Sequence, residues 1–139
     1  MKTIYRCMYV ALFIGTLCFS QNKQDSNKQN FAEQFFMDIN VYHKLKQYSA
    51  KNKILIVDPN KYLTNKELTY NNKDLEIQIL PEMKAGFIFL IKKVIINDNL
   101  AFVGMWKNDS VTALCFYPVL SEFTPNKWIV EEITTRSIK

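Results

Sequence analysis

The spacing of apolar residues changes once along this chain, from a helical period to a strand period, and this change limits the folds that the chain can adopt. Between Phe31 and Leu45, apolar side chains recur every three or four residues, which predicts one amphipathic helix. Asn30 and Glu33 have the spacing of a capping box, so we expect the helix to begin there. From Lys53 onward, apolar residues alternate with polar ones, as in strands with one face in water.

The second part of the chain consists of short β-rich runs separated by turn signals such as Asp58-Pro59-Asn60. Lys61 to Leu68 fits either a single helical turn or an irregular loop. We therefore predict an α+β fold, in which an N-terminal helix packs on a curved, mostly antiparallel sheet of five or six strands. The predicted strands are Ile54 to Val57, Leu75 to Ile79, Phe87 to Ile96, Leu100 to Trp106, Val111 to Tyr117 and Trp128 to Ile133.

Two features interrupt the regular strand pattern. The alternation of apolar residues shifts at Lys92 and Lys93, which predicts a β-bulge or an edge protected by lysines. Pro118 and Pro125 bracket a longer loop before the last strand. In element order alone, without any shared motif, the predicted fold resembles nuclear-transport-factor-like and cystatin-like domains, and this resemblance implies nothing about function.

The N-terminal segment has the organisation of a secretory signal peptide. Lys2 and Arg6 precede a short apolar run, Met8 to Phe19, and small residues stand before a cleavage site at Ser20/Gln21. The run has 12 residues, which is fewer than the roughly 20 of a membrane-spanning helix. We expect a protein that is periplasmic or secreted after cleavage, with no stable membrane insertion.

Two other interpretations of this segment are weaker: a retained anchor, and a lipoprotein signal with Cys18 lipidated. The second is disfavoured because bulky Leu17 precedes the cysteine. The predicted organisation is a signal peptide over residues 1–20, a polar, flexible leader over 21–29 and a single α+β domain over 30–139.

Charge and cysteine content exclude several classes of function. Removal of Lys2 and Arg6 lowers the formal net charge from +5 to +3, and charges of both signs are interspersed, so we expect no nucleic-acid partner. Cys115 is the only cysteine after residue 20, which excludes an internal disulfide in the mature chain. It lies in an apolar run, far in sequence from the single histidine, His43, and we interpret it as a small buried residue.

No residue pattern supports catalysis or cofactor binding. Metal sites and catalytic triads need groups that one histidine and one cysteine do not supply. Glu131-Glu132 point to opposite faces of a strand unless it bulges, whereas Asp74 and Glu76 share the solvated face of theirs. We therefore expect no enzyme, no catalytic residues, no metal and no cofactor.

One short motif suggests covalent modification. Asp109-Ser110-Val111 resembles the three-residue O-glycosylation acceptor of exported proteins in some Gram-negative bacteria, at a predicted hairpin tip. Asn108-Asp109-Ser110 also matches an N-glycosylation sequon. Ser110 is therefore a candidate glycosylation site. The alternative interpretation is that Asn108, Asp109 and Ser110 occur together only because these residue types favour a turn.

Aromatic residues in the predicted strands point to a binding surface. One helix covers only one face of a sheet, so we expect some aromatic side chains to remain exposed as anchors for a partner. The predicted function is an exported, non-enzymatic protein-binding module of the bacterial envelope, such as an immunity or inhibitor protein against a periplasmic toxin. The alternative is a carrier of a small apolar ligand between helix and sheet. The candidate surface comprises Trp106, Tyr117, Trp128, Lys92 and Lys93.

Overall fold

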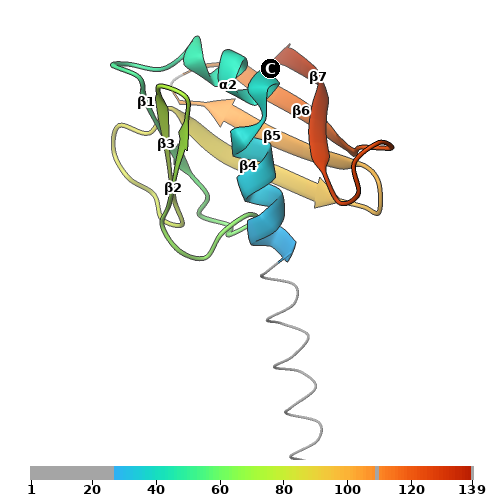
Figure 1. Ribbon diagram of the computed structural model, residues 1–139. Helices are drawn as coiled ribbons and strands as arrows, with labels where there is room; N and C mark the ends of the chain where they lie inside the picture. The colour runs from blue at the N-terminus through green and yellow to red at the C-terminus, as the bar shows by residue number, and fades with distance from the viewer. Residues whose placement is uncertain (1–26, 109, 139) are drawn as a thin grey trace, which may run out of the picture.

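The computed structural model describes residues 27–108 and 110–138, in which two consecutive helical segments lie across one face of a curved sheet (Figure 1). Residues 27–37 are helical and are followed by α2, Ile39–Lys46. Asn30 therefore lies inside a helix and does not begin one, contrary to the capping-box prediction. The predicted signal peptide lies outside the described residues, as do positions 21–26 of the predicted leader; its residues 27–29 are helical.

The predicted single helix is broken at Asp38. The backbone of Asp38 is extended, with φ −66° and ψ 138°, and its carboxylate accepts hydrogen bonds from the backbone N–H groups of Asn40 and Val41. These are N-cap bonds, which satisfy amides that have no partner within α2. Hydrophobic periodicity continues across the break, and for this reason the spacing alone predicted one helix.

The sheet has seven strands in the order β2-β3-β1-β4-β5-β6-β7 (Figure 1). The α+β class is as predicted, but five or six strands was an underestimate, and the sheet is mixed. The pairs β1/β3 and β1/β4 are parallel, and the other four pairs are antiparallel. The strands are β1, Lys53–Val57; β2, Leu68–Asn72; β3, Leu75–Leu80; β4, Phe89–Ile96; β5, Ala101–Lys107; β6, Thr112–Leu120; and β7, Trp128–Ser137.

The additional strand is β2, which the sequence did not suggest because Asn71-Asn72 has the composition of a turn. Asn72 is buried, and its side-chain amide donates to the backbone carbonyls of Phe36, at 2.9 Å, and Asp38, at 3.3 Å. These carbonyls lie at the break between the two helical segments. The asparagine therefore belongs to a strand that anchors the helix break.

The C-terminal strands are longer than predicted. β6 continues through Pro118, which was expected to end it, and the β6/β7 register shifts between Tyr117 and Pro118. A bulge accommodates proline because it removes the need for a regular ladder hydrogen bond. The predicted bulge at Lys92-Lys93 is confirmed by a register shift between Ile91 and Lys93.

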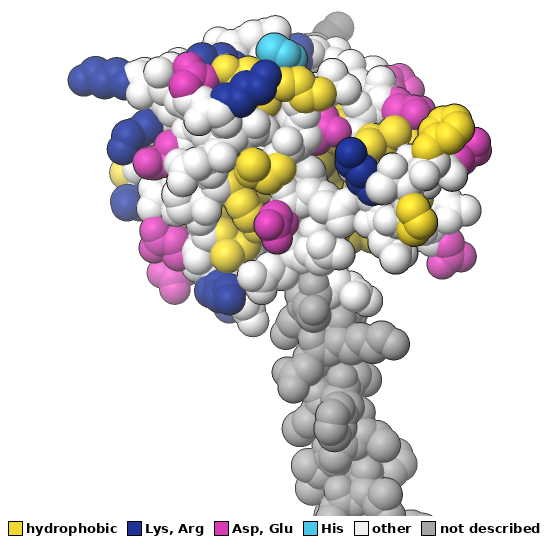
Figure 2. All heavy atoms as spheres, in the orientation of Figure 1, with side chains coloured by type: hydrophobic (Ala, Val, Ile, Leu, Met, Phe, Trp, Pro, Cys, Tyr) yellow, Lys and Arg dark blue, Asp and Glu magenta, His cyan; other side chains and the backbone are white. Residues whose placement is uncertain are grey.

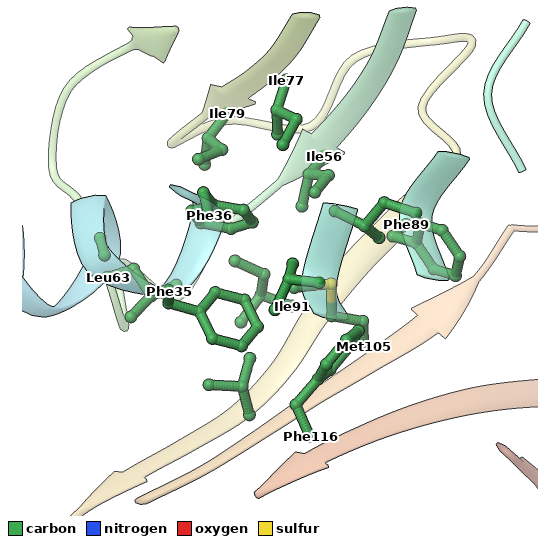
Figure 3. Packing of buried hydrophobic residues seen from close by; sticks show 14 of the residues in the cluster. Phe35, Phe36, Ile56, Leu63, Ile77, Ile79, Phe89, Ile91, Met105 and Phe116 are labelled. Carbon is green, nitrogen blue, oxygen red and sulfur yellow. The ribbon is translucent and has the colours of Figure 1, made fainter. Parts of the chain in front are cut away.

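The hydrophobic core lies between the helical segments and the concave side of the sheet (Figure 3). Phe35 contacts both Phe36, at 4.9 Å between ring centroids, and Phe116, at 5.2 Å, in edge-to-face geometry. Residues contributed by the strands include Ile56, Ile77, Ile79, Phe89, Ile91, Val103, Met105 and Leu114. The packing of aromatic residues from the helix on this side leaves the other side of the sheet without helical cover in the described part of the chain.

Candidate binding surfaces

The side of β4–β7 that faces away from the helices is called here the outer face. Its composition follows from strand alternation and register, because directly paired residues share a face. On β5, Ala101, Val103 and Met105 belong to the core, so Phe102 and Trp106 point outward. The outer face of these four strands carries Leu90, Lys93, Ile95, Phe102, Gly104, Trp106, Ala113, Cys115, Tyr117, Glu132, Thr134 and Arg136.

The structure brings two predicted surface residues together at one end of the outer face. Lys92 Nζ lies 4.5 Å from the centroid of the Trp106 ring, in a cation–π contact. The Trp106 side chain is 38% exposed, which is substantial for an indole. Lys93 lies beside the bulge, is exposed and is paired with Gly104. This end is therefore aromatic and basic.

Tyr117 forms the middle of the outer face. Its ring meets that of Phe102 at 5.5 Å between centroids, and its hydroxyl accepts a hydrogen bond of 3.1 Å from Arg136. In the β6/β7 register, the paired residues Cys115 and Thr134 lie between Tyr117 and Arg136. This position explains why Cys115 is only 7% exposed although it is not part of the core. Its burial agrees with the prediction of a small buried residue.

The opposite end of the outer face holds apolar residues that sequence reasoning missed. Leu100 is bridged to Val119, which is paired with Ile129, and these side chains border a shallow groove of about 400 Å³ together with Phe123. Leu100 is 61% exposed and Phe123 is 96% exposed. The sequence signal for Phe123 was an aromatic residue isolated among the polar residues Ser121, Glu122 and Thr124.

The loop that presents Phe123 has a defined conformation. The hydroxyl oxygen of Ser121 accepts hydrogen bonds from the backbone N–H groups of Phe123, at 3.2 Å, and Thr124, at 3.1 Å. Such side-chain-to-backbone bonds stabilise a turn. These bonds fix the backbone of the turn from which Phe123 projects into solvent.

Trp128 does not belong to the outer face. Its ring packs edge-to-face on Phe31, at 5.3 Å between centroids, on the side of the sheet that carries the helices. It lines a cavity of about 760 Å³ between the start of the described helix and the β4–β5 hairpin. The cavity is lined by apolar Phe31, Tyr62, Val94, Ile96, Leu120 and Trp128, and by polar Asn27, Lys28, Asn30, Asn97, Asp98 and Asn126.

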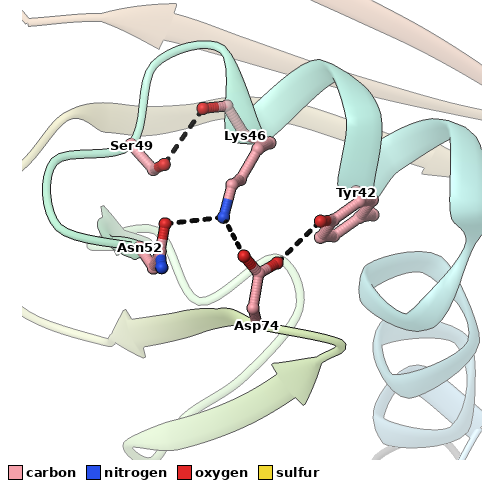
Figure 4. Close-up of polar contacts among 5 residues, drawn as sticks. All are labelled: Tyr42, Lys46, Ser49, Asn52 and Asp74. Atoms are coloured by element: carbon pink, nitrogen blue, oxygen red, sulfur yellow. Dashed lines mark hydrogen bonds and ion pairs between the residues drawn. The ribbon is translucent and has the colours of Figure 1, made fainter.

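A polar cluster joins α2 to the β2–β3 turn (Figure 4). Asp74 accepts hydrogen bonds of 2.6 Å from both Tyr42 Oη and Lys46 Nζ, and Lys46 also donates to Asn52. The bond from Lys46, followed by that from Tyr42, lowers the pKa of Asp74. The bond to Asp74 raises the pKa of the Tyr42 phenol. These exposed contacts tie α2 to the β2–β3 turn.

The other predicted chemical groups are dispersed. Glu76 forms an ion pair of 3.2 Å with Lys53, apart from Asp74. His43 stacks edge-to-face on Tyr42 at the helix surface. Glu131 is skipped by the β6/β7 register, and both it and Glu132 are exposed. Among the described residues, no group of three or more His, Cys, Asp or Glu side chains is arranged to hold a metal ion.

The hydroxyl of Ser110, the candidate glycosylation residue, is engaged in a turn. It donates a hydrogen bond of 2.9 Å to Thr112 Oγ1 and accepts one from the Thr112 backbone N–H. The Asn108 side-chain amide donates to the Phe87 carbonyl at 3.1 Å. Asp109, the middle of the sequon, lies outside the described residues.

Charges of both signs are interspersed with small apolar areas on the helix-bearing face seen in Figure 2. No helix in residues 27–108 and 110–138 combines the length and apolar character needed to cross a membrane. The fold defines an α+β protein with a mixed, curved, seven-stranded sheet. Comparison with protein-family models, curated proteins and solved structures gives no match.

Proposed function

We propose that this chain is an exported, non-enzymatic protein-binding module of the bacterial envelope, and that it binds its partner through the outer face of β4–β7. The single observation behind this proposal is the apolar and aromatic character of a sheet face that no described helix covers. The sharpest version is an immunity or inhibitor protein that neutralises a toxin in the periplasm. Export follows from the predicted signal peptide.

The outer face has the chemistry of a contact surface. Trp106 lies at its basic end, Phe102 and Tyr117 lie along its centre, and Leu100 and Phe123 extend it to the β6–β7 loop. Contiguous exposed apolar surface typically marks an interaction site, and tryptophan and tyrosine contribute most to binding where they are desolvated. The face therefore offers anchors at its centre and at both ends.

Charge at the basic end indicates the complementary partner. Lys92 and Lys93 lie beside Trp106 and are exposed. Carboxylates on a partner would meet both lysines and the indole edge together, which favours encounter and orientation more than affinity. We expect an acidic rim on the bound protein.

An affinity capture tests the proposal. The full-length gene is expressed with a tag, so that the cell carries out any processing of the protein. The tagged protein is then mixed with envelope and secreted fractions, and the captured proteins are identified by mass spectrometry. We expect one dominant protein that is retained at high salt. Trp106→Ala should weaken its binding by about 2 kcal/mol, or roughly thirtyfold.

The matched control is Met83→Ala, which removes another exposed apolar side chain, in the connection between β3 and β4. Binding that is lost equally in both variants, or a capture without any specific protein, would contradict a partner on the outer face.

The cavity beside Trp128 favours a second candidate function, a carrier of a small apolar or amphipathic ligand. Its volume of about 760 Å³ is within the usual range for small-molecule sites, and its lining combines apolar side chains with amides. Trp106→Phe leaves Trp128 as the only tryptophan, so fluorescence reports on this cavity alone. Native mass spectrometry that finds no bound ligand, together with unchanged Trp128 emission during lipid titration, would refute the carrier.

A further inference from the structure

The open edge of the sheet at β7 is half covered. Three side chains of the helical region bond to the first part of this strand: Gln34 Oε1 accepts from the Trp128 N–H at 2.7 Å, Asp38 Oδ2 accepts from the Val130 N–H at 3.0 Å, and Asn40 Nδ2 donates to the Val130 carbonyl at 2.7 Å. These side chains replace the hydrogen bonds of a neighbouring strand. Up to Val130, the edge is therefore closed to pairing.

The second part of β7 has no such cover. The Ile138 N–H donates a hydrogen bond to the Val111 carbonyl, so the backbone hydrogen-bonding groups of Ile138 point toward β6. Alternation then turns the backbone groups of Ile133, Thr135 and Ser137 away from β6, because no further register shift occurs in this segment. Apart from β6, no described residue bonds to these groups. An exposed edge of this length is a template for another strand.

The residues of this segment favour a strand partner. Ile133, Thr134 and Thr135 are β-branched, and the edge between Glu131 and Ser137 contains neither proline nor lysine, the residues that commonly block edge pairing. At the other edge of the sheet, β2 has only five residues. The unoccupied part of β7 is thus the better site for pairing.

Charge complementarity identifies the occupant. If two β7 strands pair antiparallel about Thr134, each Glu132 lies directly opposite Arg136 of the second copy. All three residues lie on the outer face, so the side chains of each pair lie on the same side of the joined sheet. They occupy non-hydrogen-bonded positions, where opposed side chains are closest. One strand therefore carries both halves of a two-fold-symmetric contact.

We propose that the chain forms a homodimer through residues 131–137 of β7, so that one sheet runs continuously through both copies. The paired segment stops short of Trp128 and Val130, whose backbone groups are already bonded to helical side chains. The two outer faces then form one larger surface. The dimer does not depend on the proposed partner, because its hydrogen bonds and ion pairs come from β7 alone.

Charge reversal tests the dimer. In sedimentation velocity of the untagged protein, we expect a concentration-dependent dimer. Glu132→Arg sets arginines opposite each other at both ends of the paired segment, and Arg136→Glu does the same with glutamates. Each variant should weaken dimerisation about tenfold or more. The double exchange, Glu132→Arg with Arg136→Glu, restores opposite charges and should restore the dimer.

A mixture of the two single variants provides the decisive result. Each alone should be monomeric at a concentration where the equimolar mixture forms a heterodimer. Glu76→Arg, which changes a partly exposed strand glutamate outside β7, is the matched control and should leave dimerisation unchanged. Circular dichroism establishes that each variant is folded. A wild-type monomer at all concentrations, or a dimer insensitive to these reversals, would overturn the proposal.

Discussion

Two side chains of β2 determine how the helical region is attached to the sheet. Asn72 is buried and donates to carbonyls at the helix break, whereas neighbouring Asn71 is exposed. Tyr70 stacks on Phe36, at 5.6 Å between ring centroids. Its hydroxyl oxygen is buried and, within the described residues, has no hydrogen-bond partner. One residue thus satisfies buried polar groups, and the other leaves one unsatisfied.

Asn72→Ala should lower the free energy of unfolding by about 2 kcal/mol, since the Phe36 carbonyl loses a buried hydrogen bond, whereas the Asp38 carbonyl keeps its bond from the Tyr42 N–H. Asn71→Ala is the matched control, and we expect a change below about 0.5 kcal/mol because the side chain is solvated. Urea unfolding followed by circular dichroism measures both variants. Equal effects of the two substitutions would show that the Asn72 amide does not hold the helix break.

Tyr70→Phe should raise the free energy of unfolding at neutral pH by about 1 kcal/mol, because it removes a buried hydroxyl without a partner. Burial, followed by the charge of Glu33, raises the pKa of Tyr70 from 10.0 to about 12. The unfolded chain ionises first, so wild-type stability should fall relative to the variant as pH rises through this interval. Unfolding titrations between pH 9 and 12 measure the difference; parallel pH profiles would contradict the assignment.

At the scale of the elements, the Asp38 carboxylate connects α2 to β7. One carboxylate oxygen caps α2 through Asn40 and Val41, and the other accepts from the Val130 N–H of β7. Gln34 and Asn40 bond to the same strand from either side of the helix break. The break in the helix therefore places polar side chains where they close half of a sheet edge.

Asp38→Asn and Asp38→Ala should separate these two roles. Asparagine retains one acceptor for the cap but loses the second, so we expect faster hydrogen exchange at the Val130 amide and a small loss of stability. Alanine removes both acceptors and should cost about 2 kcal/mol. Amide exchange by NMR and urea unfolding measure the two effects. Unchanged Val130 exchange in both variants would contradict the role of Asp38 at the edge.

At the scale of the whole molecule, the curved sheet has two different sides. The helical region covers the concave side and completes the core, whereas the outer face retains Trp106, Leu100 and Phe123 in contact with water. The open half of β7 borders this face. Partner binding and self-association would therefore use adjacent but distinct groups: side chains of the face in one case, and backbone groups of the edge in the other.

The two proposed surfaces should respond independently. Trp106→Ala is expected to abolish most partner capture but to leave the dimer intact, because Trp106 lies on β5 and β6 separates it from β7. Glu132→Arg is expected to produce monomers that remain folded. Sedimentation and affinity capture of both variants measure this. Loss of both properties in a folded Trp106→Ala protein would show that one surface serves both.

Much of the fold could be predicted from local spacing. The helical character of the segment before Lys53, the alternating strands and the bulge at Lys92-Lys93 all follow from residues within a few positions of one another, although Ile39 of the predicted apolar stripe is exposed beyond the break at Asp38. The exposure of Trp106 was also predictable, since a single helical layer leaves one sheet face open. These features were predictable because local periodicity indicates which side chains lie on the same face of a helix or strand.

Which strands lie next to each other, and which side chains pack together across the fold, could be known only from the tertiary structure. The parallel placement of β1 between β3 and β4, the recruitment of Asn71-Asn72 into β2 and the position of Trp128 against Phe31 all depend on contacts between residues far apart in sequence. The half-closed edge of β7 was missed for the same reason, whereas the exposed Phe123 had a local signal in its polar surroundings. Alternation assigns a side chain to one of two faces, but only long-range packing decides which face is covered and which edge stays open.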